Sequence, residues 1–577
     1  MFGTSIDLCW APRNNKGLGQ LRLFLACVLL APYSVAQTWP QWGRNAEHTG
    51  FASAKGQAPD RILGSFLYDP LADQISRDAG GELLVHYMTP LVDDGDVFIM
   101  SRGASRWASC RDTPPPCGTQ LWSRMQWGVT KLSSRQGGLT SQWTALSTWT
   151  PPPVSASGWE PVFHPALRGR YLYMPGGAGS LLKFNRRTGE LIATIQPFGE
   201  TDTNRYVISP LTVDAAGAVY YTVVQLDAAQ PWQSDVREAW LIKVNSAVET
   251  QTEGTQKVSF AELLPQAPVD GCVTTFSQKD LPWPPSRDAS PPALPCGGQR
   301  PGVNAAPAVA PDGTIYVVSR AHLNPAYSYL VALTSDLTLK WAASLRDRLH
   351  DGCDIVLPPS GTLGGCRAGA LTGVDPATNA PPAGRILDES TASPAIAPDG
   401  SIYFGALTRY NYDRGHLFHF DSAGGFLGTY DFGWDMTPAI FEHDGTWSVI
   451  MKDNHYPVGS YCGLPGFCGQ GDAKYFLTSL TPDLRTEWTY QPDGEPLEWC
   501  VNMVAVDRAG TVFANSEDGN VYAVDASGKQ LGHIFLRLAI GAAYTPIAIG
   551  ENGVVYAQNA GALFAVGDGT RQLRKLE

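Results

Sequence analysis

Clusters of positive charge are missing from this sequence. The chain has 42 lysine and arginine residues against 54 aspartate and glutamate residues, which gives a formal net charge of −12 at pH 7. Nucleic-acid backbones are bound by grouped lysine and arginine side chains. The composition therefore excludes nucleic acid as a partner.

The signature motifs of common enzymes and metal sites are missing as well. The sequence has no Gly-x-Ser-x-Gly nucleophile motif, no phosphate-binding Walker loop, no dinucleotide fingerprint and no Cys-x-x-Cys pair. We therefore assign no catalytic residue and no metal ligand from the sequence, and we lean toward a protein that is not an enzyme.

Long apolar runs are absent beyond the N-terminus. Residues 23–31 form a short apolar run, and Ser34, Val35 and Ala36 follow it with the small-x-small pattern of a leader cleavage site. A membrane-spanning helix needs about 20 apolar residues, so this run is too short for an anchor. The sequence predicts a signal peptide over residues 1–36, no membrane span, and an exported chain that is periplasmic, in the outer envelope or secreted.

Cysteines are few, but eight of those beyond the predicted leader form couples that are close in sequence. Because an exported chain meets an oxidising environment, disulfides are favoured over the alternative of a metal site. Cys500 is left over, and it would be free or would rearrange one couple. The predicted pairs are Cys110–Cys117, Cys272–Cys296, Cys353–Cys366 and Cys462–Cys468.

A repeated segment organises the rest of the chain. Residues 306–316, 393–403 and 545–556 each have a small residue, a proline, a short apolar strand, an Asp-Gly or Asn-Gly turn, and a β-branched and aromatic strand. Asp-Gly and Asn-Gly supply the positive φ angles that tight hairpins require. The eight predicted units are marked by Pro90, Pro161, Pro210, Pro307, Pro394, Pro438, Met503 and Pro546.

Third and fourth strands complete most units, and the third strands are apolar on both faces, as in a blade packed between two neighbours. Repeats of about 40–50 residues with four strands are typical of β-propeller blades. We predict an all-β fold, an eight-bladed β-propeller of four-stranded antiparallel blades. The last unit has only three strands, so residues 62–68 are predicted to add the fourth strand and close the ring. A seven-bladed ring and two smaller propellers are the alternatives.

The predicted domain organisation follows from these boundaries. A signal peptide over residues 1–36 is followed by an N-terminal segment over 37–60, the propeller over 61–570 and a tail over 571–577. A monomer is expected.

The repeat resembles that of the quinoprotein (pyrroloquinoline quinone, PQQ) superfamily, and residues 39–50 (WPQWGRNAEHTG) are similar to the first segment of its members. That superfamily includes quinone-dependent alcohol dehydrogenases and non-enzymatic propellers such as the outer-membrane assembly lipoprotein BamB. The resemblance implies the fold over residues 39–567 and, for an enzyme, PQQ and calcium. The superfamily's docking motif is degenerate here, since only residues 184–189 keep its Thr-Gly core, and the adjacent cysteine pair of the alcohol dehydrogenases is absent. We therefore expect no cofactor, with PQQ and calcium as the alternative.

Long insertions are placed unevenly along the repeats. They occupy about residues 101–126, 224–238, 250–303, 346–388 and 453–473, between the second and third strands of a blade or between the fourth strand and the next blade. In an antiparallel blade both loop types leave the same face, which we name the long-loop face, and the opposite face is the short-turn face. Because function concentrates on loops presented by a rigid scaffold, the long-loop face is the predicted binding surface.

Residues just before the first strand of each blade are predicted to ring the channel mouth on the long-loop face. In three units a tryptophan stands beside a carboxylate, a pair that can stack on a flat or sugar-like ligand and anchor its polar edge. Packing of each tryptophan between blades is the alternative. The predicted ligand-binding residues are Trp159, Glu160, Arg205, Glu389, Trp434, Asp435, Glu498 and Trp499.

The favoured function is that of an exported, non-catalytic binding or scaffold propeller whose long-loop face binds a protein, a glycan or a small ligand. The alternative is a PQQ- and calcium-dependent dehydrogenase that uses the central funnel, with Asp435 as the general base and Trp434 stacked on the quinone. A polysaccharide-active enzyme is a third hypothesis, and it requires paired acids in the funnel.

Overall fold

The structure is a computed structural model of the chain. It describes residues 38–78, 83, 85–104, 125–134, 138–153, 160–245, 254–276, 286–350, 352–355, 368–375, 377–408, 414–433, 435–455, 474–494, 497–499, 501–538 and 545–568. The predicted signal peptide and C-terminal tail lie outside these residues. Among the residues that the structure describes, no helix has the length and apolar character needed to span a membrane.

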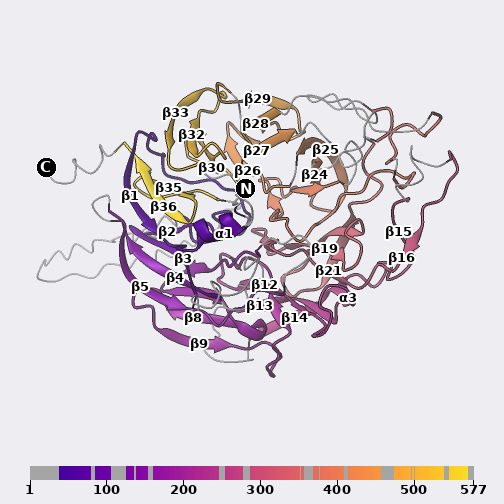
Figure 1. Cartoon of the computed structure of the whole chain (residues 1–577), viewed down its shortest axis with the longest axis horizontal. Helices are drawn as coiled ribbons and strands as arrows, with labels where there is room; N and C mark the ends of the chain where they lie inside the picture. Colours follow the sequence, from indigo (N-terminus) through magenta and orange to yellow (C-terminus); the bar gives the residue numbers. More distant parts are fainter. Residues whose placement is uncertain are drawn as a thin grey trace, which may run out of the picture. The chain divides into compact units, whose positions relative to one another are not determined.

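Eight antiparallel sheets lie side by side in a ring around a common centre, so the predicted eight-bladed propeller is confirmed (Figure 1). Blade 1 consists of β2 (Leu91–Asp93), β3 (Asp96–Ala104), β4 (Met125–Ser133) and β5 (Thr140–Leu146); blade 2 of β6 (Ala166–Arg168), β7 (Tyr171–Pro175), β8 (Leu181–Asn185) and β9 (Leu191–Ile195); blade 5 of β22 (Ala395–Ile396), β23 (Ile402–Leu407), β24 (Arg414–Phe420) and β25 (Phe426–Gly433). Blade 6 consists of β26 (Ala439–His443), β27 (Thr446–His455), β28 (Lys474–Leu480) and β29 (Thr486–Tyr490); blade 7 of β30 (Ala505–Val506), β31 (Val512–Asn515), β32 (Asn520–Val524) and β33 (Gln530–Phe535).

Blades 3 and 4 have a first strand that is split in two, because both parts pair with the same second strand. Blade 3 consists of β10 (Arg205–Val207), β11 (Thr212–Val213), β12 (Val219–Gln225), β13 (Glu238–Val244) and β14 (Thr255–Ser259), and blade 4 of β17 (Gln299–Pro301), β18 (Ala308–Val309), β19 (Ile315–Ala321), β20 (Ser328–Leu333) and β21 (Leu339–Ser344). Outside the blades lie α1 (Ala72–Asp78), η4 (Gly177–Gly179), α3 (Phe260–Leu263) and the hairpin of β15 (Cys272–Val273) with β16 (Ala293–Leu294).

The ring is closed by the N-terminal strand, as predicted. Blade 8 combines β34 (Ala548–Ile549), β35 (Val555–Asn559) and β36 (Ala562–Gly567) with β1 (Arg61–Leu67). β1 pairs antiparallel with β36 from Arg61 opposite Gly567 to Leu67 opposite Ala562 (Figure 1). A strand from the start of the chain therefore covers the edge that the last three strands would leave open.

One predicted repeat position is wrong. The first strand of blade 2 begins at Ala166, so it follows Pro165 and not Pro161. The hairpin turn of this blade has Gly169 at φ 51, and Arg168 pairs with Tyr171 across it. Pro161 instead follows Glu160, which forms a β-bridge with Val85 of the segment before blade 1. Pro161 and Pro165 both match the proline of the repeat. Only the apolar strand and the glycine turn that follow Pro165 show that it marks blade 2.

Polar contacts near the unit prolines link each blade to the next around the ring. In blade 5, for example, the Ser393 amide donates to Thr437 Oγ1 of blade 6 (2.9 Å), and Ser393 Oγ accepts the amide of Ala306 in blade 4 (2.9 Å). The other links are Thr89 N to His164 Nε2 (3.1 Å), Leu211 N to His164 O (3.2 Å), Thr212 Oγ1 to Pro307 O (2.6 Å), Thr437 N to Asn502 O (3.2 Å), Asn515 Nδ2 to Thr545 O (2.7 Å) and Gln558 Nε2 to Met88 O (2.8 Å). At Ser393, Thr437 and Thr545 the small polar residue before the proline thus helps hold neighbouring blades together.

Residues 38–57, which we name the crossing segment, run across the short-turn side of the innermost strands. The second residue of each first strand donates its amide to this segment in most blades: Leu167 to Pro40 O (2.7 Å), Val309 to Ala46 O (2.8 Å), Ile396 to Glu47 O (2.9 Å), Ile440 to Thr49 O (2.8 Å), and Val506 to Gly50 O (2.9 Å). Val92 donates to Trp39 O (2.9 Å), and Val213 donates to the Gln41 side chain (2.5 Å). One continuous segment therefore satisfies equivalent inner-strand amides of seven blades.

Candidate functional site

The ring centre is filled by polar side chains that bond to one another. Asn304, fully buried in the split first strand of blade 4, accepts the amide of Val162 through its Oδ1 (2.8 Å) and donates through Nδ2 to Ser390 O (3.2 Å). Its own amide donates to Ile208 O (2.7 Å), and Nδ2 lies 3.3 Å from Nδ1 of His86. One asparagine thus joins segments that precede blades 1, 2 and 5 to those of blades 3 and 4.

Glu160, predicted to face a ligand, is part of a buried ion-pair cluster. Its carboxylate pairs with Arg102 of β3, whose guanidinium also pairs with Asp69. Trp127 Nε1 donates to Glu160 Oε1 (3.2 Å), and Tyr87 donates to Asp69 (2.7 Å). Burial raises the pKa of Glu160, and Arg102 opposes that shift. All the polar atoms of this carboxylate are therefore used within the fold.

A second cluster lies where blade 4 meets blade 5. Asp388 accepts from Arg300 of β17 (2.7 Å) and lies 3.5 Å from Arg320 of β19. Burial alone would raise the pKa of Asp388, but the two guanidiniums hold it at about 2. Arg300 also donates to Nδ1 of His322 (2.9 Å), and burial lowers the pKa of that histidine to about 3. Glu389, predicted as a ligand contact, is partly exposed beside this cluster, and burial raises its pKa.

Asp435, which precedes blade 6, links that blade to blade 5. Its Oδ2 accepts the Ser390 hydroxyl (2.7 Å) and the amides of Thr391 (2.9 Å) and Ala392 (3.1 Å), and the residue is fully buried. Trp434, predicted to stack on a ligand beside it, lies outside the described residues. Asp435 thus binds the turn before the first strand of blade 5.

The remaining predicted site residues lie in different surroundings. Trp499 is fully buried, and its ring centroid lies 5.4 Å from that of Tyr522 and 6.2 Å from that of Tyr490. This tryptophan therefore packs within the fold, which was the alternative to ligand contact. Arg205 stacks on Phe198, with 4.6 Å from Cζ to the ring centroid, and bonds Glu200 (3.2 Å). Glu498 is partly exposed and lies 3.4 Å from Asn454 Nδ2. Trp159 lies outside the described residues.

The partners of the central carboxylates show whether these residues could hold a quinone and a calcium ion. Calcium is held by carboxylate and carbonyl oxygens that face it, and a quinone needs an accessible aromatic face. Glu160 uses both of its carboxylate oxygens within the fold. Asp388 and Asp435 each use Oδ2 in the fold, and the Oδ1 of each is buried without a hydrogen-bond partner among the described residues. Trp499 has no exposed face. No group of three His, Cys, Asp or Glu side chains within the described ranges has a metal-binding arrangement. The described central residues therefore do not fit the cofactor set, and we derive no chemistry through it.

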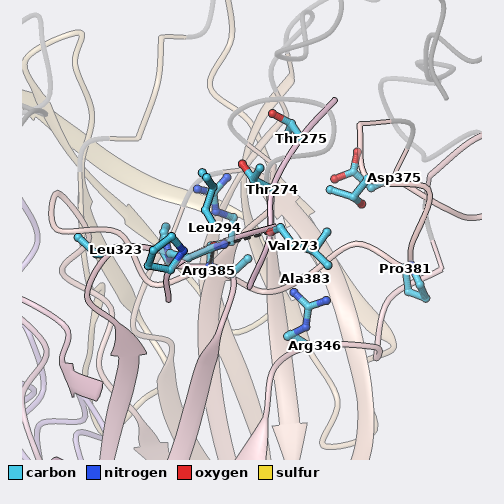
Figure 2. A pocket seen from close by; sticks show the side chains of 15 residues that line it. Val273, Thr274, Thr275, Leu294, Leu323, Arg346, Asp375, Pro381, Ala383 and Arg385 are labelled. Carbon is cyan, nitrogen blue, oxygen red and sulfur yellow. Dashed lines mark hydrogen bonds between the residues drawn. The ribbon is translucent and has the colours of Figure 1, made fainter. Parts of the chain in front are cut away.

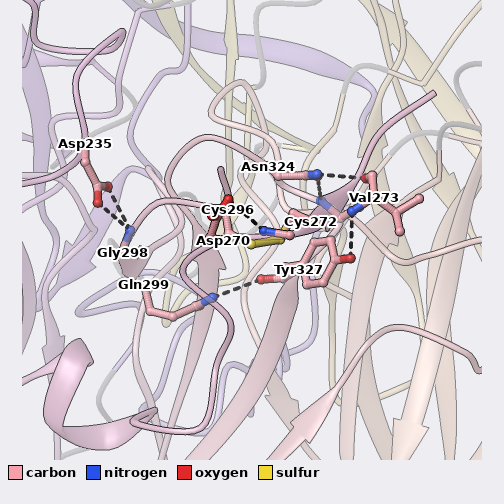
Figure 3. The surroundings of a disulfide bond; sticks show 11 residues. Asp235, Asp270, Cys272, Val273, Cys296, Gly298, Gln299, Asn324 and Tyr327 are labelled. Atoms are coloured by element: carbon pink, nitrogen blue, oxygen red, sulfur yellow. Dashed lines mark hydrogen bonds between the residues drawn. A yellow bond between two sulfur atoms is a disulfide. The ribbon is translucent and has the colours of Figure 1, made fainter. Parts of the chain in front are cut away.

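The Cys272–Cys296 disulfide, which the sequence predicted, is present (Figure 3). It joins the ends of an insertion between blades 3 and 4, where β15 pairs with β16. Val273 beside it donates its amide to the Tyr327 hydroxyl (2.9 Å) and accepts Asn324 Nδ2 (3.0 Å), both in or beside the loop between β19 and β20. The hairpin is therefore fixed to blade 4 on its long-loop side.

The other predicted cysteine pairs fall wholly or partly outside the described residues. Cys353 is disulfide-bonded, and Cys366, its predicted partner, is among the residues that the structure does not describe. The pairs Cys110–Cys117 and Cys462–Cys468 also lie outside those residues. Cys500 lies outside them as well.

A pocket of about 290 Å³ opens beside the disulfide hairpin (Figure 2). Its walls come from the hairpin, from the loop between β19 and β20, and from the insertion that leads from blade 4 to blade 5. Phe276 donates its amide to Ala377 O (2.8 Å), and Asn379 Nδ2 donates to Arg287 O (2.8 Å), so the two insertions brace each other. The lining includes Val273, Thr274, Thr275, Leu294, Leu323, Asn324, Pro325, Arg346, Asp375, Thr378, Pro381, Ala383 and Arg385.

Sequence reasoning did not select any residue of this pocket. It favoured the channel mouth, whereas the cavity lies between insertions farther out on blade 4, and its volume is near the lower end of the roughly 300–1,000 Å³ typical of small-molecule sites. The signal available in the sequence was the pair of adjacent insertions around residues 250–303 and 346–388, of which the first carries the confirmed disulfide. The described structure is thus an eight-bladed propeller with a ligand-sized pocket among its insertions.

Comparison with solved structures supports the class of fold. A europium-containing methanol dehydrogenase matches with a TM-score of 0.51 and 11% sequence identity, over 91% of this chain and 90% of that chain. The resemblance to the quinoprotein-type propellers is therefore confirmed as a likeness of fold. No protein-family model and no curated protein sequence matches the chain.

Two further solved structures are similar at a lower level. The quinohemoprotein alcohol dehydrogenase ADHIIG from Pseudomonas putida HK5 has a TM-score of 0.48 and 12% identity, over 92% of this chain and 76% of that chain. BamB from Moraxella catarrhalis has a TM-score of 0.39 and 11% identity, over 88% of this chain and 98% of that chain.

Proposed function

We propose that this chain is an exported, non-catalytic binding propeller that holds a small ligand in the pocket between its two braced insertions. The observation that carries the proposal is the pocket itself, whose walls include a disulfide hairpin that is hydrogen-bonded to blade 4. A site whose walls are fixed in advance loses little conformational freedom on binding. The disulfide also supports export, because such bonds persist in oxidising compartments.

The partners of the central carboxylates support a binding role over the dehydrogenase alternative. A general base must be able to reach the proton that it removes. Asp435, the base in that alternative, is fully buried and accepts three hydrogen bonds from blade 5. The polysaccharide-active alternative needs paired acids, and Glu160 and Asp435 are both engaged within the fold.

A thermal-shift screen of the mature chain against small metabolites, followed by a pocket-filling variant, tests the proposal. A ligand that binds only the native state raises the melting temperature. Ala383→Phe places a ring in the pocket and should abolish the shift, whereas Ala423→Phe, at an exposed turn between β24 and β25, should leave it unchanged. Shifts that survive Ala383→Phe would contradict the proposal.

The dehydrogenase alternative has its own assay. With added PQQ and calcium, the mature chain should produce no dye-linked oxidation of alcohols or sugars above the level given by PQQ and calcium alone. Oxidation that requires the protein and is lost in Asp435→Asn would replace the binding proposal by the enzymatic one.

A further inference from the structure

The lining of the pocket carries more positive than negative charge. Arg346, after β21, and Arg385, before β22, both line it, and Asp375 is the single carboxylate among the described lining residues. Arg346 lies over the ring of Tyr327, with 4.1 Å from Cζ to the ring centroid, which fixes the direction of its side chain. In Figure 2 the Arg346 side chain extends from the lower edge of the cavity toward its interior.

The carboxylate in the lining is already used by the backbone. Asp375 is buried and its Oδ1 accepts the amide of Ala377 (2.8 Å) in the turn that follows it. A carboxylate held in this way stabilises the turn. The two guanidiniums supply the positive charge of the lining and are planar groups whose geometry matches that of a carboxylate.

Positive charge also stands behind the pocket. Burial, together with the nearby charges of Arg300 and Arg385, lowers the pKa of Arg320 to about 9, and the charges of Asp388 and Glu389 oppose that shift. Asp388 is in turn shared between Arg300 and Arg320. Three guanidiniums and the two carboxylates of Asp388 and Glu389 thus meet in one region, and the remaining positive charge favours an anion in the adjoining cavity.

Apolar side chains complete the lining. Leu294 of β16 is 54% exposed and Leu323 is 38% exposed, and both line the pocket together with Pro325 and Pro381. Exposed leucines next to two guanidiniums suit a molecule with an apolar body and a planar anionic end, because guanidinium groups bind carboxylates in a bidentate manner.

We propose that the pocket binds a small organic carboxylate, with its apolar part against Leu294 and Leu323 and its carboxylate on Arg346 and Arg385. This assignment rests on the proposed function, since it names the chemical class of the ligand held at the same site. The pocket volume of about 290 Å³ selects a short aliphatic or single-ring acid.

Isothermal titration of the mature chain with hexanoate and phenylacetate, and with the matching neutral amides hexanamide and phenylacetamide, tests the assignment. The acids should bind at least about tenfold more tightly than the amides, because only the acids carry a negative charge and two equivalent oxygens that form bidentate ion pairs with guanidiniums. Arg346→Gln and Arg385→Gln should each weaken acid binding by about tenfold and leave amide binding nearly unchanged. Arg187→Gln, an exposed arginine in the turn between β8 and β9, is the matched control and should change neither.

The outcomes separate the two levels of the proposal. Equal affinity for acids and amides, unaffected by the arginine variants but abolished by Ala383→Phe, would overturn the carboxylate assignment and leave a binding site at this pocket. Acid binding that survives both arginine variants and Ala383→Phe would overturn the assignment and the site together. Failure of both acids to bind the unmodified chain would overturn the carboxylate assignment. The metabolite screen would then test whether the pocket binds any small molecule.

Discussion

Removing the crossing segment should destabilise the whole ring. In a variant that lacks residues 37–57 but keeps β1, seven inner-strand amides lose their acceptors, one in each of blades 1 to 7. A net contribution of about 0.5–1.5 kcal/mol for each hydrogen bond gives about 4–10 kcal/mol in total. The fully buried indoles of Trp39 and Trp42 are lost in addition. That sum is comparable with the roughly 5–15 kcal/mol that stabilises a typical protein.

Urea unfolding followed by tryptophan fluorescence measures this loss, and a point variant isolates one contact. Gln41→Ala removes the side chain that accepts from Val213 (2.5 Å) and donates to Val213 O (3.1 Å), which should cost about 1–3 kcal/mol. Gln142→Ala, an exposed glutamine on β5, is the control and should change stability little. An unchanged urea midpoint after deletion of residues 37–57 would refute the idea that this segment holds the inner strands.

Three further perturbations follow from the buried groups. Arg102→Met leaves two buried carboxylates without their cation, so the free energy of unfolding in urea should fall by about 3–5 kcal/mol, and an unchanged value would show that the cluster adds no stability. Four histidines have folded-state pKa values lowered by burial to about 3 or 4, so the unfolded chain binds more protons below pH 6.5, and stability should fall by about 5 kcal/mol per pH unit as the pH drops from about 6 toward 4. Equal urea midpoints at pH 7.5 and pH 5 would contradict this expectation. Cys272→Ser opens a loop with a sequence separation of 24, which should cost about 3 kcal/mol and make the hairpin a site of limited proteolysis; resistance equal to that of the unmodified chain would count against the bracing role of the disulfide. The four histidines are His48, His86, His164 and His322.

Local sequence rules were sufficient for most of the fold. The Asp-Gly and Asn-Gly turns and the apolar strands around them repeat with little variation, so the blades could be counted, and the missing strand of the last blade pointed to β1. Pro161 was mistaken for Pro165 because the motif tolerates either proline until the turn glycine is considered. The path of residues 38–57 could not be predicted, since six of the seven inner-strand amides are accepted by backbone carbonyl groups, which any sequence supplies.

The candidate site was harder to predict because burial is a property of the assembled ring. In the sequence, Glu160 and Asp435 are acidic residues beside a tryptophan, and nothing local shows that Arg102 or the amides of blade 5 will bind them. The pocket depends on contacts between insertions about a hundred residues apart, such as that of Asn379 with Arg287. The predicted insertions include two of the three segments that form the pocket, whereas the loop between β19 and β20 and the geometry between the segments required the structure.

Hydrogen–deuterium exchange tests the central claim, that the working surface lies among the braced insertions of the long-loop face. A compound that raises the melting temperature in the screen is added to the mature chain, and exchange is compared with and without it. We predict slower exchange over residues 272–276, 322–327 and 381–386, with the short turns at 442–447 and 507–511 unchanged. Slower exchange confined to those short turns, with the pocket segments unaffected, would contradict the account.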